Sequence, residues 1–163
     1  ALVNNAATPG QLRNFGRQDA AATFRKLAIN LAAPMALMDL AVRLRPDGAR
    51  LRIVNLSSGL AYRARAGLAD YCASKAALHM AGEVLADEAH PDTAVFNYQP
   101  GIVDTEMQEQ LRRESSEDFE SVHIFEAMHE EGRLAPANDV LDPIVDFLGD
   151  ADASGFHEDR YAP

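Results

Sequence analysis

Cysteine is scarce in this sequence: Cys72 is the only one, which excludes an internal disulfide and a cysteine-based metal cluster. Positive charge is also limited, because 15 Lys and Arg residues against 25 Asp and Glu residues leave a net charge of −10. This balance argues against nucleic acid or an anionic membrane as partner. No uninterrupted apolar run approaches the ~20 residues of a transmembrane helix, so we expect no membrane partner. His123 and His129 do not share a helix face, and we expect no metal site.

The composition is that of one ordinary globular domain. With 47% apolar and 25% charged residues, 163 residues are enough to form a core that buries roughly 70% of the unfolded surface. The chain starts inside an apolar run, Ala1-Leu2-Val3, and not at a methionine. We therefore expect residues 1–163 to be the C-terminal part of a single longer domain, with any targeting signal outside this segment and a cytoplasmic location.

Strand-like and helix-like segments alternate along the chain. Helical composition predicts long helices over 19–45 and 69–89, an interrupted acidic helix over 105–132 and a helix over 137–148. Apolar, β-rich runs predict short strands over 1–4, 51–56, 93–98 and 155–160. Strands separated by helices predict an α/β fold with a doubly wound parallel sheet, Rossmann-like and incomplete because the N-terminal strands are lacking.

Three residues suited to the reduction of a carbonyl group lie at the end of the strand expected over 51–56 and on the helix that follows it. Tyr71 and Lys75 are four residues apart and share a helix face, and Ser58 follows the strand expected over 51–56. A phenol, an ammonium and a hydroxyl can together protonate a carbonyl oxygen while a hydride reaches its carbon. The nearby cation is expected to lower the pKa of Tyr71 by roughly 1–3 units. Thirteen of the 15 basic residues are arginine, so a chance lysine at this spacing is less common, although the pair alone could be a surface contact.

Asn30 stands out because Pro34 follows it by four residues. In an α-helix the carbonyl of residue 30 accepts from the N–H of residue 34, and proline has no N–H to donate. We expect a free carbonyl and a kinked helix at Asn30. This carbonyl could bind a water molecule, or the kink could have no function.

The motifs resemble those of the short-chain dehydrogenase/reductase family in order, spacing and context, over essentially the whole chain. They are Asn4-Asn5-Ala6, Asn30, Ser58, Tyr71-x-x-x-Lys75 and Pro100-Gly101-Ile102-Val103-Asp104-Thr105. Within that family the chain most resembles the sepiapterin reductases, through Tyr71-Cys72-Ala73, Asn97-Tyr98, Asp104-Thr105-Glu106-Met107-Gln108 and Ser154-Gly155-Phe156-His157-Glu158-Asp159.

The resemblance implies a role for each matching residue. Tyr71 would be the general acid, Lys75 would support it and hold the nicotinamide ribose, and Ser58 would bind the carbonyl oxygen. Asn30 would hold a water that relays protons. The implied cofactor is NADPH, with contacts from Asn4, Ala6, Lys75, Val103, Asp104, Thr105, Glu106, Met107 and Gln108. The implied substrate site consists of Ser58, Tyr71, Gly101 and Asp159, whose carboxylate would accept two parallel N–H donors of a pterin ring.

The activity that this resemblance implies is NADPH-dependent reduction of the side-chain ketone of a pterin, in tetrahydrobiopterin biosynthesis. The enzyme would be a homodimer that acts on a small molecule. Reduction of other vicinal dicarbonyls is an alternative with the same chemistry. A non-catalytic truncated paralogue that serves as a dimerisation module is an alternative of another class. The family's glycine-rich phosphate-binding turn has no counterpart in these residues, and Ala7 replaces a usual glycine. We therefore expect the 163 residues alone to be inactive.

Overall fold

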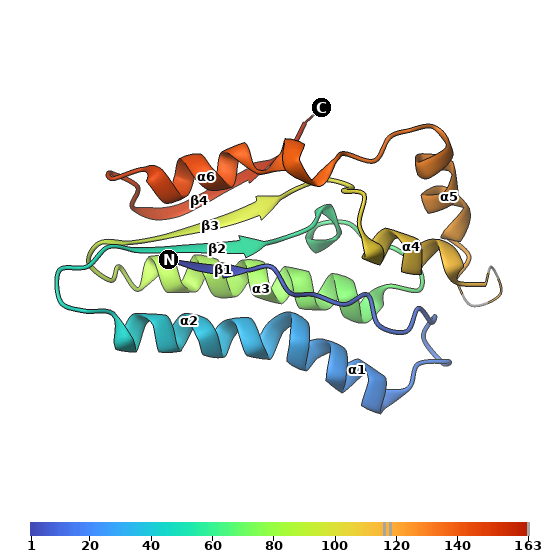
Figure 1. The fold of residues 1–163 in the computed structure, drawn as a ribbon. Helices are drawn as coiled ribbons and strands as arrows, with labels where there is room; N and C mark the ends of the chain where they lie inside the picture. Colours follow the sequence, from blue (N-terminus) through green and yellow to red (C-terminus); the bar gives the residue numbers. More distant parts are fainter. Residues whose placement is uncertain (116, 118, 163) are drawn as a thin grey trace.

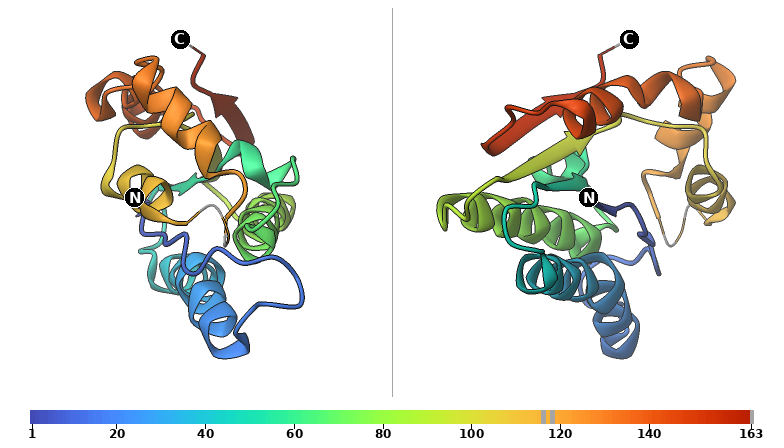
Figure 2. Two further views of the ribbon diagram at one scale, coloured as in Figure 1. Left: turned by 90° about the vertical axis from the view of Figure 1, so that its right-hand side faces the viewer. Right: turned by 60° about the vertical axis from the view of Figure 1, so that its left-hand side comes forward.

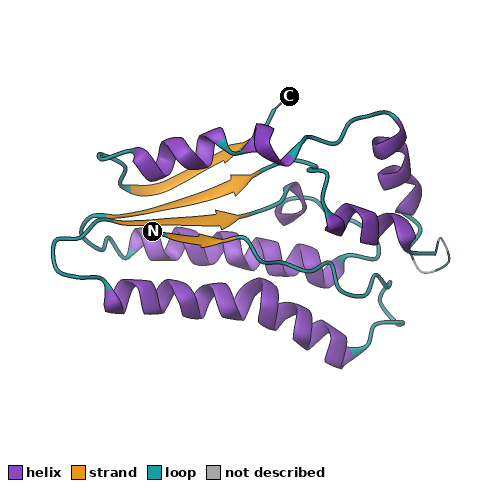
Figure 3. Cartoon of the chain, in the orientation of Figure 1, coloured by secondary structure: helices purple, strands orange, loops and turns teal. Residues whose placement is uncertain are grey.

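A four-stranded parallel sheet forms the centre of the molecule. The computed structural model describes residues 1–115, 117 and 119–162. The strands are β1 (Leu2–Asn4), β2 (Leu51–Leu56), β3 (Thr93–Gln99) and β4 (Gly155–Arg160), and they lie side by side in that order. Figure 3 shows the strands running in one direction. The four expected strands and the Rossmann-like α/β class are confirmed.

Helices cover both faces of this sheet. One face carries α1 (Ala20–Leu27), the π-helical turn η1 (Ala28–Ala32), α2 (Ala33–Leu44) and α3 (Ala69–Asp87), and the other carries α6 (Asp142–Gly149) (Figure 1). Two further helices, α4 (Glu106–Arg113) and α5 (Val122–Glu130), lie beyond the carboxyl ends of the strands, as Figures 1 and 2 both show. Short 3₁₀ segments follow β2 and precede α6, at Gly59–Ala61 (η2) and Ala137–Val140 (η3).

The break expected at Asn30 takes the form of a π-helical turn. Asp19 begins the helical run by accepting a hydrogen bond from the N–H of Ala22 at 2.7 Å. Within η1 the N–H of Ala33 donates to the carbonyl of Ala28, five residues back, immediately before Pro34. The wider spacing of this turn tolerates the missing N–H of Pro34. Figure 1 shows the helical run changing direction between α1 and α2.

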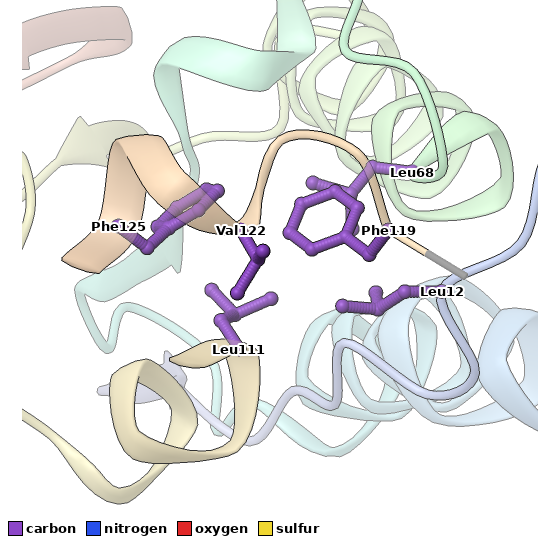
Figure 4. Close-up of a cluster of buried hydrophobic side chains, with 6 residues drawn as sticks. All are labelled: Leu12, Leu68, Leu111, Phe119, Val122 and Phe125. Carbon is purple, nitrogen blue, oxygen red and sulfur yellow. The ribbon is translucent and has the colours of Figure 1, made fainter. Parts of the chain in front are cut away.

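Apolar side chains fill both faces of the sheet and a third region beyond its carboxyl edge. Adjacent residues of β2 serve opposite faces, because Ile53 packs towards α2 and α3 while Val54 packs towards α6. The third cluster joins the loop after β1, the start of α3 and the α4–α5 segment (Figure 4). Its buried members are Leu12, Leu68, Leu111, Phe119, Val122 and Phe125.

Three buried asparagines cross the sheet in register. Asn4 donates to the side-chain oxygen of Asn55 at 2.8 Å, and Asn55 donates to that of Asn97 at 3.0 Å. Asn97 in turn donates to the backbone carbonyl of His79 on α3, at 3.1 Å. Gly82 of α3 lies directly against this asparagine ladder, and a Cβ there would lie 2.9 Å from the Asn97 oxygen. The buried amides are thus satisfied by one another and by α3.

The helical run Ala20–Leu44 is 25 residues long and apolar enough, by length and composition, to cross a membrane. The expectation of no membrane-spanning segment considered uninterrupted apolar runs only, and it did not anticipate this helix. The π-helical turn joins two shorter helices into one run whose charged residues are sparse, which a search for uninterrupted apolar residues does not find. Only 17% of its most apolar window is buried in the fold. A helix of this kind is weak evidence for membrane insertion, and the absence of a membrane partner stays a prediction.

Candidate active site

The predicted trio of Ser58, Tyr71 and Lys75 comes together at the carboxyl edge of the sheet. Tyr71 lies in the first turn of α3, Lys75 one turn later, and Ser58 at the N-terminal cap of η2, directly after β2. The Ser58 hydroxyl lies close enough to the Tyr71 phenol to lower the pKa of that phenol. The Lys75 Nζ lies 5.9 Å from the centre of the Tyr71 ring and donates to the carbonyl of Leu56 at 2.6 Å. A hydroxyl, a phenol and an amine thus share one small region.

Burial dominates the electrostatics of this region. It raises the pKa of the Tyr71 phenol, and the hydrogen bond from Ser58 lowers that pKa by a smaller amount. Lys75 is only 4% exposed, and burial lowers its pKa from 10.5 to about 8. The expectation that Lys75 would give Tyr71 a depressed pKa was wrong, because desolvation of the phenolate outweighs the favourable contacts. At neutral pH Tyr71 is therefore a protonated phenol and Lys75 is largely an ammonium.

Asn30 connects the helical run to the start of α3. Its side chain accepts from the N–H of Thr8 and donates to the carbonyl of Thr8, both at 2.9 Å. The same amide donates to the Ser74 hydroxyl at 3.4 Å, and Ser74 donates to the backbone carbonyl of Tyr71 at 2.7 Å. Asn30 thus holds the loop after β1 against the helix that carries the trio. Its role in binding a proton-relaying water stays a prediction.

The predicted cofactor segment forms the loop after β3 and the first turns of α4. Gly101 has a φ of +74°, a conformation that favours glycine. Val103 pairs with Ala135, and the N–H of Asp104 donates to the Ala135 carbonyl at 2.9 Å, which fixes the loop. Thr105 caps α4, and the helix then presents Glu106, Met107 and the buried Gln108. The Gln108 side-chain oxygen is buried and has no hydrogen-bond partner in the described part of the chain.

Other predicted residues lie elsewhere. The side chain of Asn4 belongs to the asparagine ladder, while Ala6 is exposed in the loop between β1 and α1. Asp159 lines a hollow beside α6 together with Phe96 and Phe147, and none of the trio lines that hollow. Its contact with a substrate stays a prediction.

Sequence reasoning missed one ion pair next to the trio. The Lys26 Nζ lies 2.5 Å from the Asp70 carboxylate, and Asp70 immediately precedes Tyr71. The available signals were that Lys26 is one of only two lysines and that it precedes Asn30 by four residues, on the same helix face.

A parallel α/β sheet with a serine after one strand and a Tyr-x-x-x-Lys pair on the following helix defines a class of oxidoreductase folds. The sequence model described as short chain dehydrogenase matches residues 1–116. The chain belongs to this family, and the resemblance noted from its motifs is confirmed.

Two groups of reductases are among the proteins that this chain resembles. A sepiapterin reductase of Meriones unguiculatus is 34% identical over 165 residues, which cover 98% of this chain and 62% of that protein. A benzil reductase ((S)-benzoin forming) of Bacillus cereus is 31% identical over 152 residues, which cover 90% of this chain and 61% of that protein. The chain therefore spans about three fifths of the length of these relatives.

Solved structures show the same fold. The KRED1-Pglu enzyme superposes with a TM-score of 0.83 at 23% identity, over 96% of this chain and 66% of that one. A short chain dehydrogenase from Escherichia coli CFT073, complexed with NADPH, gives a TM-score of 0.75 at 22% identity, over 99% of this chain and 62% of that one.

Proposed function

We propose that residues 1–163 are the C-terminal part of a single short-chain dehydrogenase domain, and that the complete protein is an NADPH-dependent carbonyl reductase. The observation that carries this proposal is that Ser58, directly after β2, and Tyr71, in the first turn of α3, come together beside the buried Lys75. The coverage of 61–62% of the reductase relatives supports the proposed extent of the chain. A retained trio also argues against the non-catalytic dimerisation module as the main role.

The residues of the trio divide the chemistry of ketone reduction between them. Bound NADPH supplies a hydride to the carbonyl carbon. The Ser58 hydroxyl donates a hydrogen bond to the carbonyl oxygen as negative charge develops there. Tyr71 gives its phenolic proton to that oxygen, and its raised pKa keeps the proton available at neutral pH. The ammonium of Lys75 stabilises the phenolate left behind, and proton exchange with solvent restores the phenol.

Several donors and acceptors around the trio fit a bound dinucleotide. The Lys75 ammonium has three donors and, among the described residues, a single hydrogen-bond partner, the Leu56 carbonyl. Two donors thus remain for ribose hydroxyls. The orphaned side-chain oxygen of Gln108 can accept from a carboxamide N–H, and the φ of +74° at Gly101 lets the loop after β3 turn. The NADPH complex of a structural relative adds support for the choice of dinucleotide.

The two groups of relatives suggest two substrate classes for the complete enzyme. We favour the side-chain ketone of a pterin, as in tetrahydrobiopterin formation, because the sepiapterin reductases match 98% of this chain and the benzil reductases 90%. Reduction of an aromatic α-diketone is the second candidate, since the benzil reductases reach a similar identity.

Steady-state kinetics of the complete enzyme on sepiapterin and on benzil test both the reductase activity and the substrate class. Replacement of Tyr71 by Phe should lower kcat on the preferred ketone by at least ~100-fold, because proton donation is lost. Asp159→Ala should raise KM or lower kcat for sepiapterin and leave benzil unaffected. Equal rates for the Tyr71→Phe variant and the unmodified enzyme would remove the enzymatic proposal. Unchanged sepiapterin kinetics in Asp159→Ala would remove the proposed pterin contact alone.

We also propose that the enzyme is a cytoplasmic homodimer. The helical run and α3 both carry exposed apolar side chains, namely Phe24, Met35, Leu37, Leu40, Leu44, Met80 and Val84. Exposed apolar side chains on neighbouring helices favour a protein partner over water. Sedimentation of the complete enzyme should give a dimer, and Leu40→Glu with Met80→Glu should give a monomer.

A further inference from the structure

The ion pair of Lys26 and Asp70 helps to hold the backbone of Tyr71, and neither residue belongs to the trio. Lys26 of α1 is 1% exposed, and its Nζ lies 2.5 Å from the Asp70 carboxylate, whose side chain is 10% exposed. The same carboxylate oxygen accepts a hydrogen bond from the backbone N–H of Tyr71 at 2.9 Å. A buried charge therefore reaches the backbone of the proposed general acid through one intervening residue.

Groups from the loop after β1 and from α3 hold the Lys26 side chain in place. Its Nζ also donates to the carbonyl of Gln11 in the loop after β1, at 3.0 Å. Gly10 makes this approach possible: its φ is +60°, and a Cβ there would lie 2.2 Å from the Lys26 Cε. The Thr23 hydroxyl lies 3.5 Å from the second oxygen of Asp70. A lysine that only packed its methylene groups against a core would keep its ammonium in water, whereas the Lys26 ammonium is held inside the fold by protein partners.

The ion pair has a counterpart one turn further along both helices. Lys26 and Asn30 are four residues apart in the run α1–η1, and Asp70 and Ser74 are four residues apart in α3. The second pair is the contact of Asn30 with Ser74 at 3.4 Å. While Asp70 accepts from the N–H of Tyr71, Ser74 donates to the Tyr71 carbonyl at 2.7 Å. Both polar groups of the Tyr71 backbone are thus held by side chains that are tied to α1–η1.

We propose that Lys26 and Asp70 are positioning residues for the reduction: the pair fixes the first turn of α3, and with it the phenol of Tyr71, against the loop after β1. This inference rests on the proposed carbonyl reductase function. Neither residue touches the reacting atoms. Proton transfer depends steeply on geometry, and a misplacement of about 1 Å lowers a rate by about 100-fold.

A variant that removes the ion pair without leaving a buried charge gives the decisive test. Lys26→Met with Asp70→Leu replaces both charges by apolar groups of similar size, an exchange that folded proteins often tolerate. In the complete enzyme, kcat on the preferred ketone should fall at least ~10-fold, while KM and the Kd for NADPH stay within ~3-fold. The primary isotope effect with 4-deuterated NADPH should rise, because the chemical step becomes slower than the others.

Two further variants separate positioning from general damage. Asp70→Asn keeps an acceptor for both Lys26 and the Tyr71 N–H, so its kcat should stay within ~3-fold of the unmodified enzyme. Asp39→Leu with Arg43→Met removes an exposed pair of 3.2 Å on α2 and should change nothing.

The proposal is overturned if the Lys26→Met, Asp70→Leu enzyme retains its kcat per cofactor-binding site, or if it loses kcat with no change in isotope effect. It is also overturned if this enzyme does not fold while Asp70→Asn lowers kcat as strongly as Tyr71→Phe. Inactivity of the unmodified enzyme on all ketones would instead refute the proposed reductase function.

Discussion

The two lysines of this chain are both buried, and we expect their replacement by methionine to change stability in opposite directions. Burial lowers the pKa of Lys75 to about 8 from 10.5 in the unfolded chain. At about 1.4 kcal/mol for each pKa unit, keeping its charge inside the fold destabilises the protein by about 3 kcal/mol. Loss of the hydrogen bond to Leu56 offsets about 1 kcal/mol of the gain on removal. Lys75→Met should therefore stabilise the cofactor-free enzyme by about 2 kcal/mol, or about 4–8 °C in Tm, while activity is lost.

The stability difference between the unmodified enzyme and Lys75→Met should depend on pH, because the pKa of Lys75 differs between the folded and unfolded states. Below the folded pKa of about 8, Lys75 is protonated in both states and the full penalty is present. As the pH rises from 8 towards 10.5, the folded state loses the proton first, so the unmodified enzyme gains stability relative to the variant. Thermal unfolding at pH 7 and at pH 9.5 should show the advantage of Lys75→Met at the lower pH and very little of it at the higher.

Lys26→Met is the matched control, because this lysine is as deeply buried but is paired with Asp70 at 2.5 Å. Its removal leaves a carboxylate without its partner and should destabilise the enzyme by about 3–5 kcal/mol. A Lys75→Met enzyme that melts below the unmodified one at pH 7 would refute the reasoning. So would a difference in Tm that is equal at the two pH values.

Three further substitutions test other parts of the structure. Ser58→Ala should lower kcat by about 100-fold with little change in KM, since a donor to the developing oxyanion is lost; steady-state rates equal to those of the unmodified enzyme would contradict its role. Gly82→Ala places a Cβ 2.9 Å from the Asn97 oxygen and should destabilise by about 1–3 kcal/mol in urea unfolding, whereas an unshifted midpoint would mean that the ladder yields easily. Phe119→Ala removes a fully buried ring packed on Gly67 and should cost about 3–5 kcal/mol. Hydrogen exchange should then rise in α4 and α5 more than in β2, and equal increases in both would argue against a separable cluster.

Local sequence patterns predicted most of the fold and the centre of the site. The four strands and α3 depend on apolar runs bounded by turn residues, which short-range patterns record well. The trio was found because Tyr71 and Lys75 are neighbours on one helix, and because Ser58 follows a strand whose end is marked by serine and glycine. The π-helical turn followed in part from Pro34, which removes a donor at a known spacing. All of these inferences use neighbours along the chain.

Features that depend on three-dimensional proximity were not predicted. The Lys26–Asp70 pair joins residues 44 positions apart, and its recognition requires the packing of α1 against α3. The direction of the Tyr71 pKa depends on how deeply the phenol is buried, and the Tyr-Lys spacing contains no information on this. Asp159 was assigned from a C-terminal motif, while its surroundings depend on which face of β4 meets α6.

The asparagine ladder constrains how the parallel strands can align. Apolar strands of similar length can slide past one another at little expense, since one aliphatic side chain replaces another. A shift of β2 by a single residue would carry the amide of Asn55 to the opposite surface of the sheet and leave Asn4 and Asn97 unsatisfied in a dry interior. Misaligned arrangements are thereby penalised during folding, and a change at any one of the three positions requires matching changes at the other two.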